Sequence, residues 1–485
     1  MRHLIIIIFL ILEFNLILIS QTTDFFHTRF GLELDETANS IIASKKKGYL
    51  IVGQTNSMGS LNTDIYLART DTFGLPIWQK HFGGFQPDIA NSVVELSDTS
   101  FVISGYTSSY GNGGYDALIA RFNKDGILMW IKTFGGLDWD FANKINLTHD
   151  GNLIVCGSTY SFGRGGEDAF VIKLDLNGNI LWQKIYGGLN NDDFHSIKAT
   201  SDGGFIACGT TKSYGDILGD IWVAKLTLNG DSVWFKTYGG NKVEVGKDIV
   251  EDKFNDYVFV GGSESFSNGK LDAIIYKTNS VGVEDWYRFF GLSSEDETVL
   301  EVINSNLING GYVIIYQTKE IPFYKLDTKS LLLDKNGYYI NGGRVGSTDD
   351  EEVMSVGSSY DKGYVVAGYS KGFGATNKDI FIVKFDSTMN GPGALYVGLN
   401  KGSNQEKDDN ELQITPSIFI DRVKIIRNKE LKINKVELYS INGQRVFELT
   451  EPDDIIKFNE FLPAGVYLIY VYTKENIVIR KLIKK

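Results

Sequence analysis

The phrase GNILWQKIYGG, residues 178–188, decides the fold because close copies of it recur along the chain. The copies are GLPIWQKHFGG (74–84), GILMWIKTFGG (126–136) and GDSVWFKTYGG (230–240). The tryptophans at positions 78, 130, 182, 234 and 286 are each 52 residues apart. A fixed period of this length indicates a chain built from repeated structural units.

Each unit contains four short segments, and those of one unit are FHSIKAT, GFIACGT, DIWVAKLT and SVWFKTYGG, between residues 194 and 240. They are rich in aromatic and β-branched residues and are separated by turns such as SDG and LNG, which is typical of strands joined as hairpins. Four strands in a unit of about fifty residues predict the blade of a β-propeller.

The ends of the repeat array set the number of blades. The marker that ends each unit has its first Gly at positions 31, 83, 135, 187, 239, 291 and 342, and a second Gly follows at all of these except 31 and 291. The last unit has no fourth strand before STMNGPGALYVG (387–398), whereas TDFFHTRFGL (23–32) precedes the first complete unit and places Phe26 52 residues before Trp78. A blade shared between the two ends removes an open sheet edge. We therefore predict an all-β fold with a closed seven-bladed β-propeller over residues 21–393.

The sixth unit departs most from the repeat. Its segment YVIIYQTKEIPFYKLD (312–327) lacks the glycine loop found between the second and third strands of the other units. We expect a notch in that blade.

Composition limits the functional classes. The chain has 485 residues, 43% of them hydrophobic, and a formal net charge of −12. This content supports a large core, and the acidic balance argues against a nucleic-acid partner, which needs a basic face.

The N-terminal stretch MRHLIIIIFLILEFNLILISQ has the pattern of a secretory signal peptide. Arg2 and His3 precede an apolar run from Leu4 to Leu12, and the small residue Ser20 offers a cleavage point. The run is too short to span a bilayer comfortably. We predict a signal peptide at residues 1–20 and no transmembrane helix in the mature chain.

Cys156 and Cys208 are 52 residues apart and occupy equivalent places in neighbouring units. A disulfide is possible in an exported chain. The same column holds Val52, Ser104 and Val260 in other units, so a small buried residue is the preferred interpretation.

The chain after Gly393 no longer follows the repeat. Residues 394–414 are polar and charged and form a predicted linker, and residues 415–485 consist of alternating strand segments that predict a small β-sandwich.

Two resemblances follow from these residues. DAFVIKLDLNGNILWQKIYGG (168–188), with GSTYSFGRGGE before it, resembles bacterial β-propeller repeat proteins. VELYSINGQRV (436–446), LPAGVYLIYV (462–471) and the terminal RKLIKK are similar to the type A sorting domain of the type IX secretion system. The matching positions are Gly443, Pro463, Gly465, Tyr467, Lys484 and Lys485.

The second resemblance implies a localisation. It implies the type IX secretion machinery as a partner and a secreted or cell-surface destination, with the domain commonly removed at export. The chain departs from the family at ITPSIFIDRVKI, which keeps only Pro416 of the usual Pro-Asn-Pro motif.

Three columns of residues recur at candidate binding positions. One acidic column precedes the third strand of each unit, at Asp64, Asp116, Asp168, Asp220, Asp272 and Asp379. The other precedes the first strand, at Glu36, Asp88, Asp140, Asp192, Glu244 and Asp296. An aromatic column lies in the glycine loops and includes Tyr110, Phe162, Tyr214 and Phe266. All three should open on one face of the disc.

These columns have two interpretations. Asp88, Asp140, Asp192, Asp296, Tyr110, Phe162 and Tyr214 are candidate ligand-binding residues, for a sugar, a cationic group or calcium. A residue type repeated in every blade is also what turns and inter-blade packing require, and that interpretation is preferred.

The sequence offers no catalytic constellation. The histidines share no metal-ligand spacing, and His195 replaces the asparagine found at positions 39, 91 and 143. We favour an exported binding or adhesion module for a glycan or a protein. A secreted carbohydrate-active enzyme using paired carboxylates and a structural surface-layer component remain as alternatives.

Overall fold

The computed structural model describes residues 26–390 except 33, 58–61, 267–269, 291–296, 321–324, 346–350 and 372–376. It also describes residues 412–484 except 416–417, 420–421, 428–431, 441–444, 451, 453–454, 459–461, 463–464 and 474–476. The described residues fall into two compact units, one within residues 25–401 and one within 402–485. The predicted signal peptide and residues 394–411 of the predicted linker lie outside them, whereas residues 412–414 of that linker belong to the first strand of the smaller unit. Across the described ranges there is no helix that could span a membrane.

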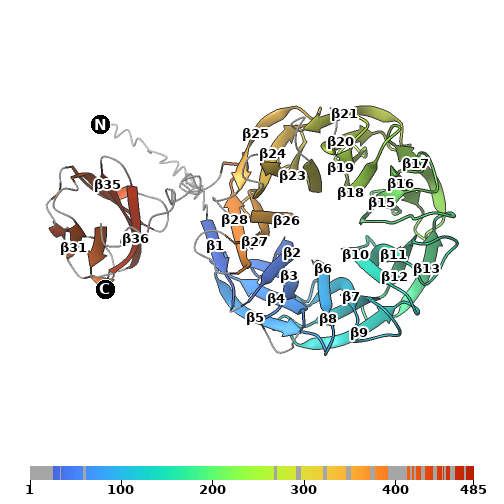
Figure 1. Cartoon of the computed structure of the whole chain (residues 1–485), viewed down its shortest axis with the longest axis horizontal. Coiled ribbons are helices and arrows are strands. Elements are labelled where there is room, and N and C mark those ends of the chain that lie inside the picture. Colours follow the sequence, from blue (N-terminus) through green and yellow to red (C-terminus); the bar gives the residue numbers. More distant parts are fainter. Residues whose placement is uncertain are drawn as a thin grey trace, which may run out of the picture. The chain divides into compact units, whose positions relative to one another are not determined.

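The larger unit is a ring of seven four-stranded antiparallel sheets (Figure 1). The strands of the first three blades are β2 (Glu36–Ala43), β3 (Tyr49–Thr55), β4 (Asp64–Thr70) and β5 (Pro76–Phe82); β6 (Asp88–Glu95), β7 (Phe101–Thr107), β8 (Asp116–Phe122) and β9 (Leu128–Phe134); and β10 (Asp140–Leu147), β11 (Leu153–Thr159), β12 (Asp168–Leu174) and β13 (Ile180–Tyr186).

The strands of blades four to six are β14 (Ser196–Ala199), β15 (Phe205–Thr211), β16 (Asp220–Leu226) and β17 (Ser232–Tyr238); β18 (Glu244–Glu251), β19 (Tyr257–Ser263), β20 (Asp272–Thr278) and β21 (Glu284–Phe290); and β22 (Glu297–Asn304), β23 (Gly311–Glu320), β24 (Lys325–Asp334) and β25 (Tyr339–Val345). Blade seven contains β26 (Glu351–Ser358), β27 (Tyr364–Ser370), β28 (Asp379–Phe385) and β1 (Phe26–Phe30).

The ring closes through a blade shared between distant parts of the chain. β1 pairs antiparallel with β28 over five residues, from Phe26 opposite Lys384 to Phe30 opposite Ile380. Phe26 is opposite Lys384 as Trp78 is opposite Arg69 in blade one, so Phe26 takes the tryptophan position. The predicted all-β, seven-bladed fold with shared-blade closure is confirmed.

The hydrophobic core lies between the blades. The second and third strands of a blade are buried along most of their length, as in β11 and β12, whereas the outer strands are partly exposed, as in β13. Side chains from adjacent blades form shared clusters, for example Val155 and Phe170 of blade three with Val102 and Ala117 of blade two. Apolar residues on both faces of each sheet are therefore covered by neighbouring sheets.

Blade six differs from its sequence interpretation in two ways. Gly342 lies inside β25, and Val345 is opposite Thr328 as Phe290 is opposite Ala273 in blade five. The marker predicted at Gly342 was therefore misplaced by four residues. β23 and β24 also continue for ten residues each and pair to Glu320 and Lys325, so the strands extend where we expected a notch.

The two thiols do not form a disulfide. Cys156 and Cys208 are both free and fully buried. Burial raises the pKa of both thiols, so they are protonated core residues. The preferred interpretation of a small buried residue is confirmed.

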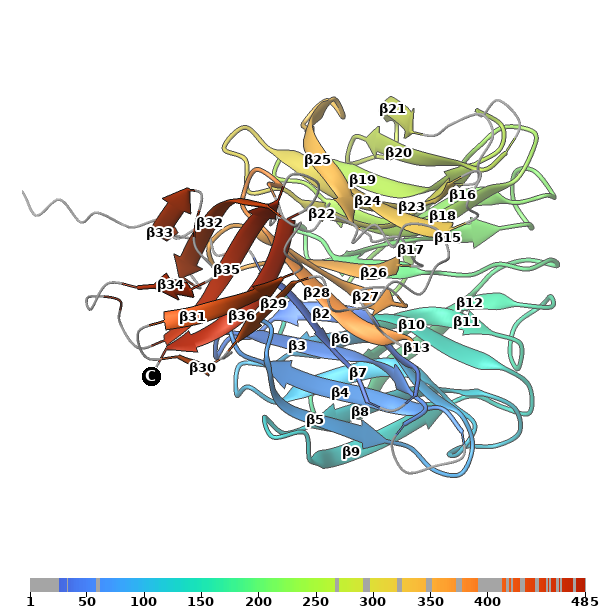
Figure 2. The same ribbon diagram turned by 60° about the vertical axis from the view of Figure 1, so that its left-hand side comes forward.

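The smaller unit is a two-sheet β-structure. One sheet contains β29 (Leu412–Thr415), β31 (Arg422–Arg427) and β34 (Ile455–Lys457). The other contains β30 (Ile418–Phe419), β36 (Ile477–Lys484), β35 (Gly465–Thr473), β32 (Ile433–Ser440) and β33 (Arg445–Thr450), with β32, β35 and β36 side by side in Figure 2. Its core includes Val436, Leu438, Tyr467 and Ile469.

The positions matched to the sorting domain are only partly described. Gly465 begins β35 opposite Lys484 near the end of β36, and Tyr467 is buried in the core. Gly443, Pro463 and Lys485 lie outside the described residues.

Candidate functional site

The acidic column at the first strand is buried. Asp88, Asp140 and Asp192 are at most 1% exposed. Asp88 accepts hydrogen bonds from the hydroxyls of Thr107 and Ser109 and from the Gly84 amide. Asp192 likewise accepts from the Thr211 hydroxyl and the Gly188 amide, and it accepts from the amide of Ser213. These carboxylates fix the loop that enters each blade, in agreement with the turn-forming interpretation. They present no exposed carboxylate to a ligand.

The column continues into blades six and seven at positions that the sequence analysis missed. Asp296 lies outside the described residues. Glu297 is the first residue of β22 and its amide donates to Leu271, as the Asp140 amide donates to Tyr115. Glu351 holds the equivalent place in blade seven and accepts from Ser370. Gly291 and Glu297 are six positions apart, whereas Gly239 and Glu244 of the preceding unit are five apart, so one extra residue shifted the sequence register.

The two acidic columns meet at the Gly-Gly marker. A Cβ at Gly135 would lie 2.2 Å from Asp116 Oδ1 and 2.6 Å from Asp140 Oδ2, and a Cβ at Gly136 would lie 2.8 Å from Ser161. The first glycine therefore leaves room for a pair of carboxyl groups and the second for a loop serine. This crowding explains why the marker recurs.

The carboxyl pairs are electrostatically strained. Burial raises the pKa of Asp220, and the nearby charge of Glu244 raises it further. Asp220 Oδ1, like Asp140 Oδ1 and Asp272 Oδ1, has no hydrogen-bond partner.

The aromatic column packs between blades. Tyr110 stacks on Phe82 with 5.8 Å between ring centroids and donates to the Gly83 carbonyl. Tyr214 donates in the same way to Gly187, and Phe162 packs on Phe134 at 5.5 Å. Phe162 and Tyr214 remain 43% and 45% exposed, so only their outer faces are accessible.

A basic column on the third strands was overlooked. Its members are Arg69, Arg121, Lys173, Lys225, Lys277 and Lys384. In blade three, Lys173 binds Asp150 of the first turn at 2.7 Å. Burial would raise the pKa of Asp150, but hydrogen bonds from Lys173 and Thr148 outweigh it and lower the pKa to about 2.

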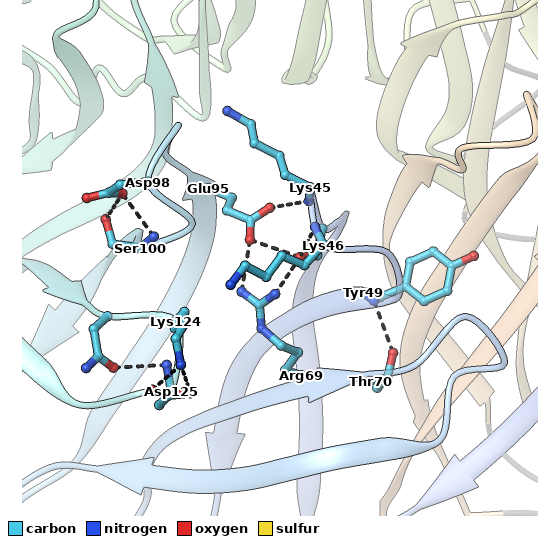
Figure 3. Close-up of polar contacts among 12 residues, drawn as sticks. Lys45, Lys46, Tyr49, Arg69, Thr70, Glu95, Asp98, Ser100, Lys124 and Asp125 are labelled. Atoms are coloured by element: carbon cyan, nitrogen blue, oxygen red, sulfur yellow. Dashed lines mark hydrogen bonds and ion pairs between the residues drawn. The ribbon is translucent and has the colours of Figure 1, made fainter.

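In blade one, the basic residue of the third strand pairs with an acid of the neighbouring blade. Its first turn has Lys46 where blade two has Asp98, so it lacks the acid. Arg69 instead binds Glu95 of blade two at 2.9 Å, and Glu95 also accepts from the Lys45 amide (Figure 3). Both ion-paired side chains are nearly inaccessible, which makes this contact an inter-blade clamp.

The central channel is lined by residues that vary from blade to blade. In six blades the inner strand has a bulge, whose extra residue is Asn39, Asn91, Asn143, Lys247, Leu300 or Met354. Each asparagine donates its side-chain amide to a carbonyl of the next blade, as Asn39 does to Ala90 at 2.9 Å. Blades four to seven lack this asparagine.

The residues that directly follow these bulges include two charged side chains that meet across the channel. Lys144 of blade three forms an ion pair with Glu301 of blade six. Glu301 also accepts from the Ser355 hydroxyl at 2.9 Å and the Val356 amide at 2.7 Å. Burial opposes the charge on Lys144, but Glu301 and Asp248 outweigh it and raise its pKa. Because the partners are three blades apart in a ring of seven, their ion pair bridges the channel.

A cavity of about 400 Å³ opens at the channel mouth above blades seven, one and two. It is lined by Thr37, Asn39, Gln54, Ile89, Asn91, Tyr106, Glu352, Met354, Tyr369 and Lys378. Lys378 Nζ lies 4.1 Å from the centre of the Tyr369 ring. Tyr106 packs edge-on against Tyr115 and Phe141, which continues the aromatic surface into blade three. The cavity combines amides, rings and opposite charges.

Within the described ranges, no group of three or more His, Cys, Asp or Glu side chains comes together in a way that could hold a metal ion.

The fold and the repeated loops define a β-propeller repeat protein. A family model described as the DUF5122 β-propeller domain of unknown function matches residues 98–128. Regulatory protein FlaEY of Caulobacter vibrioides is 25% identical over 204 residues, and the match spans 36% of this chain and 21% of FlaEY.

Solved structures show the same likeness in shape. A protein of unknown function from Dyadobacter fermentans has 9% identity and a TM-score of 0.42, over 74% of this chain and 97% of that one. The Pan2 WD40 domain of Neurospora crassa has 9% identity and a TM-score of 0.44, over 71% and 88%. A puromycin hydrolase has 11% identity and a TM-score of 0.47, over 93% and 59%. These values carry no argument about function.

Proposed function

We propose that the protein is an exported binding module whose propeller holds a glycan at the channel mouth. The observation that carries the proposal is the cavity above blades seven, one and two. Repeated positions elsewhere on the same face are committed to internal hydrogen bonds, whereas the mouth positions differ between blades. Amides and charged groups can bond sugar hydroxyls, and tyrosine rings can cover apolar sugar faces.

Export is the second part of the proposal. Residues 1–20 have the pattern of a signal peptide, and residues 415–485 resemble a type IX sorting domain. The pairing of β32, β35 and β36, with Tyr467 of β35 buried in the core, supports this assignment. The type IX secretion machinery would be the partner, and the protein would be secreted or held at the cell surface.

Binding can be tested with the full-length chain on a glycan array, with calcium and with a chelator. Lys378→Met and Glu352→Gln should each weaken a glycan hit by at least about tenfold, because a charged hydrogen bond contributes roughly 1.5–3 kcal/mol. Tyr214→Ala, on the loop column outside the cavity, is the matched control and should bind normally.

The opposite outcomes are informative. Loss of binding in Tyr214→Ala alone would move the ligand to the aromatic loops. No glycan hit under either condition would overturn the glycan proposal and favour a protein partner or a structural surface role. Turnover of a bound polysaccharide would establish the enzyme alternative.

Export is tested separately with a reporter placed between residues 1–21 and residues 394–485 in a bacterium that has a type IX system. The fusion should reach the medium or the cell surface. Replacing Lys484 and Lys485 by serine should retain it in the periplasm, and unchanged export of a fusion lacking residues 415–485 would refute the assignment.

A further inference from the structure

Three titratable side chains form a hydrogen-bonded chain on the channel wall of blades four and five. Asp193 Oδ1 lies 2.7 Å from His195 Nδ1, and His195 Nε2 lies 3.2 Å from Lys247 Nζ. The side chains of His195 and Asp193 are 31% and 20% exposed and Lys247 is half-buried, so all three residues are partly open to solvent. The Thr210 amide also donates to Asp193 Oδ1 at 3.1 Å, which holds the carboxylate in place.

The inner strand is irregular at this point. β14 begins only at Ser196, whereas the inner strands of the other blades include the equivalents of residues 192–195. Phe194 occupies a position where blades one to three have Ala38, Ala90 and Ala142, and it stacks on Trp222 at 4.6 Å. The replacement of alanine by the larger Phe194 therefore coincides with the late start of β14.

The repeat does not require any of the three residues. In blade one the position of Asp193 is Thr37, and the position shared by His195 and Lys247 is the asparagine that joins one blade to the next. Fold requirements therefore do not explain an acid, an imidazole and an amine in consecutive contact.

Donor and acceptor rules fix the proton positions. A carboxylate only accepts, so His195 Nδ1 carries a hydrogen and donates to Asp193. His195 Nε2 then accepts from the Lys247 ammonium, or, after transfer of one proton, donates to the neutral Lys247 amine. Asp193 stabilises the imidazolium formed by that transfer.

We propose that Lys247 is a nucleophilic amine that captures a small aldehyde or ketone as an imine, with His195 as its base and Asp193 as the positioning residue. His195 takes a proton from the ammonium, and the free amine attacks the carbonyl carbon. The carbinolamine receives that proton on its hydroxyl and loses water, leaving a C=N bond to Nζ. One water is released and no redox partner is needed.

The surroundings favour the neutral amine. Burial lowers the pKa of Lys247, although the charge of Asp193 opposes this effect. The site lies on blades four and five, whereas the mouth cavity is lined by blades seven, one and two. The inference therefore stands independently of glycan binding.

The test uses the full-length chain, glyceraldehyde and sodium cyanoborohydride at neutral pH, with peptide mass spectrometry of each lysine over time. Lys247 should be modified at least tenfold faster than the half-buried Lys80 and the exposed Lys124. His195→Asn, which restores the residue of blades one to three, should slow that modification at least tenfold, because a positioned base contributes roughly 10²- to 10⁴-fold.

Two controls separate the relay from other causes. His81→Asn removes a different aspartate-paired histidine, at 3.0 Å from Asp64, and should leave Lys247 labelling unchanged. The pKa of Lys198 is also lowered by burial, and this lysine has no contact with His195. Labelling of Lys198 as fast as Lys247 would show that burial alone suffices and would overturn the relay.

Other results are equally decisive. Modification of Lys247 no faster than Lys80 overturns the proposal. If His195→Asn changes the melting temperature, Asp193→Asn provides the second variant, and it should slow labelling while the fold is retained. Unchanged labelling in a folded Asp193→Asn variant would remove the positioning role.

Discussion

Closure of the ring by β1 makes a prediction about Phe26. This ring is 9% exposed, packs on Tyr49 with 5.8 Å between centroids and occupies the place that tryptophan holds in blades one to five. Truncation of a buried phenylalanine to alanine costs about 3–5 kcal/mol. Because Phe26 lies on an outer strand, we expect the lower value, about 3 kcal/mol of unfolding free energy.

The corresponding change in melting temperature follows from size. Unfolding entropy is about 2.1 cal/mol/K per residue, so a unit of several hundred residues loses roughly 4 °C for this change. Differential scanning calorimetry of Phe26→Ala measures the loss. Phe85→Ala is the matched control, because Phe85 is 92% exposed and its truncation should not alter melting.

Deleting residues 26–30 should destabilise more and promote association, because the edge of β28 loses its partner. Identical melting of Phe26→Ala and Phe85→Ala, together with a monomeric and equally stable deletion variant, would refute closure through β1.

Three further predictions concern the interior. Glu95→Ala should cost about 3 kcal/mol in chemical denaturation, because it leaves Arg69 buried without its partner, and a loss below about 1 kcal/mol would contradict the clamp. Asp220→Asn should stabilise the propeller at pH 7, since the Asp220 pKa is raised and the charged form is disfavoured. The wild type loses this stability as the pH rises above about 4, so the gain should vanish in melts near pH 3.5, and a destabilised variant at pH 7 would refute it. Cys156 and Cys208 should resist a thiol reagent in the native protein and both react in denaturant without a reductant, whereas no reaction after unfolding would indicate a disulfide.

The sequence was sufficient for the architecture because the repeat acts as its own alignment. The 52-residue spacing of the tryptophans predicts the blades, and Phe26 at the same spacing predicts closure. The register failed at blade six, where one extra residue before Glu297 moved the acid from Asp296 and later changes in length moved the marker away from Gly342. The spacing between repeats shows that one unit differs in length from the others, but it does not show where in that unit the extra residues lie.

The candidate sites were harder to predict because they depend on contacts between blades. Nothing local indicates that Lys144 meets Glu301, 157 residues away, or that Lys378 borders a cavity with Tyr106. His195 could be singled out from the sequence because it stands where other units have asparagine. The basic column from Arg69 to Lys384 could also have been recognised from the sequence. In this chain the invariant columns mark structure, and departures from them mark candidate function.

The ion pair between Lys144 and Glu301 also bears on how seven similar blades assemble in the correct order. Near-identical units can dock on the wrong neighbour, which is a characteristic folding error of repeat proteins. A ring that skipped or exchanged a blade would no longer bring blades three and six opposite each other, and both charges would then be buried without a partner. The ion pair therefore favours the ring with seven blades in the native order over rings that lack or exchange a blade.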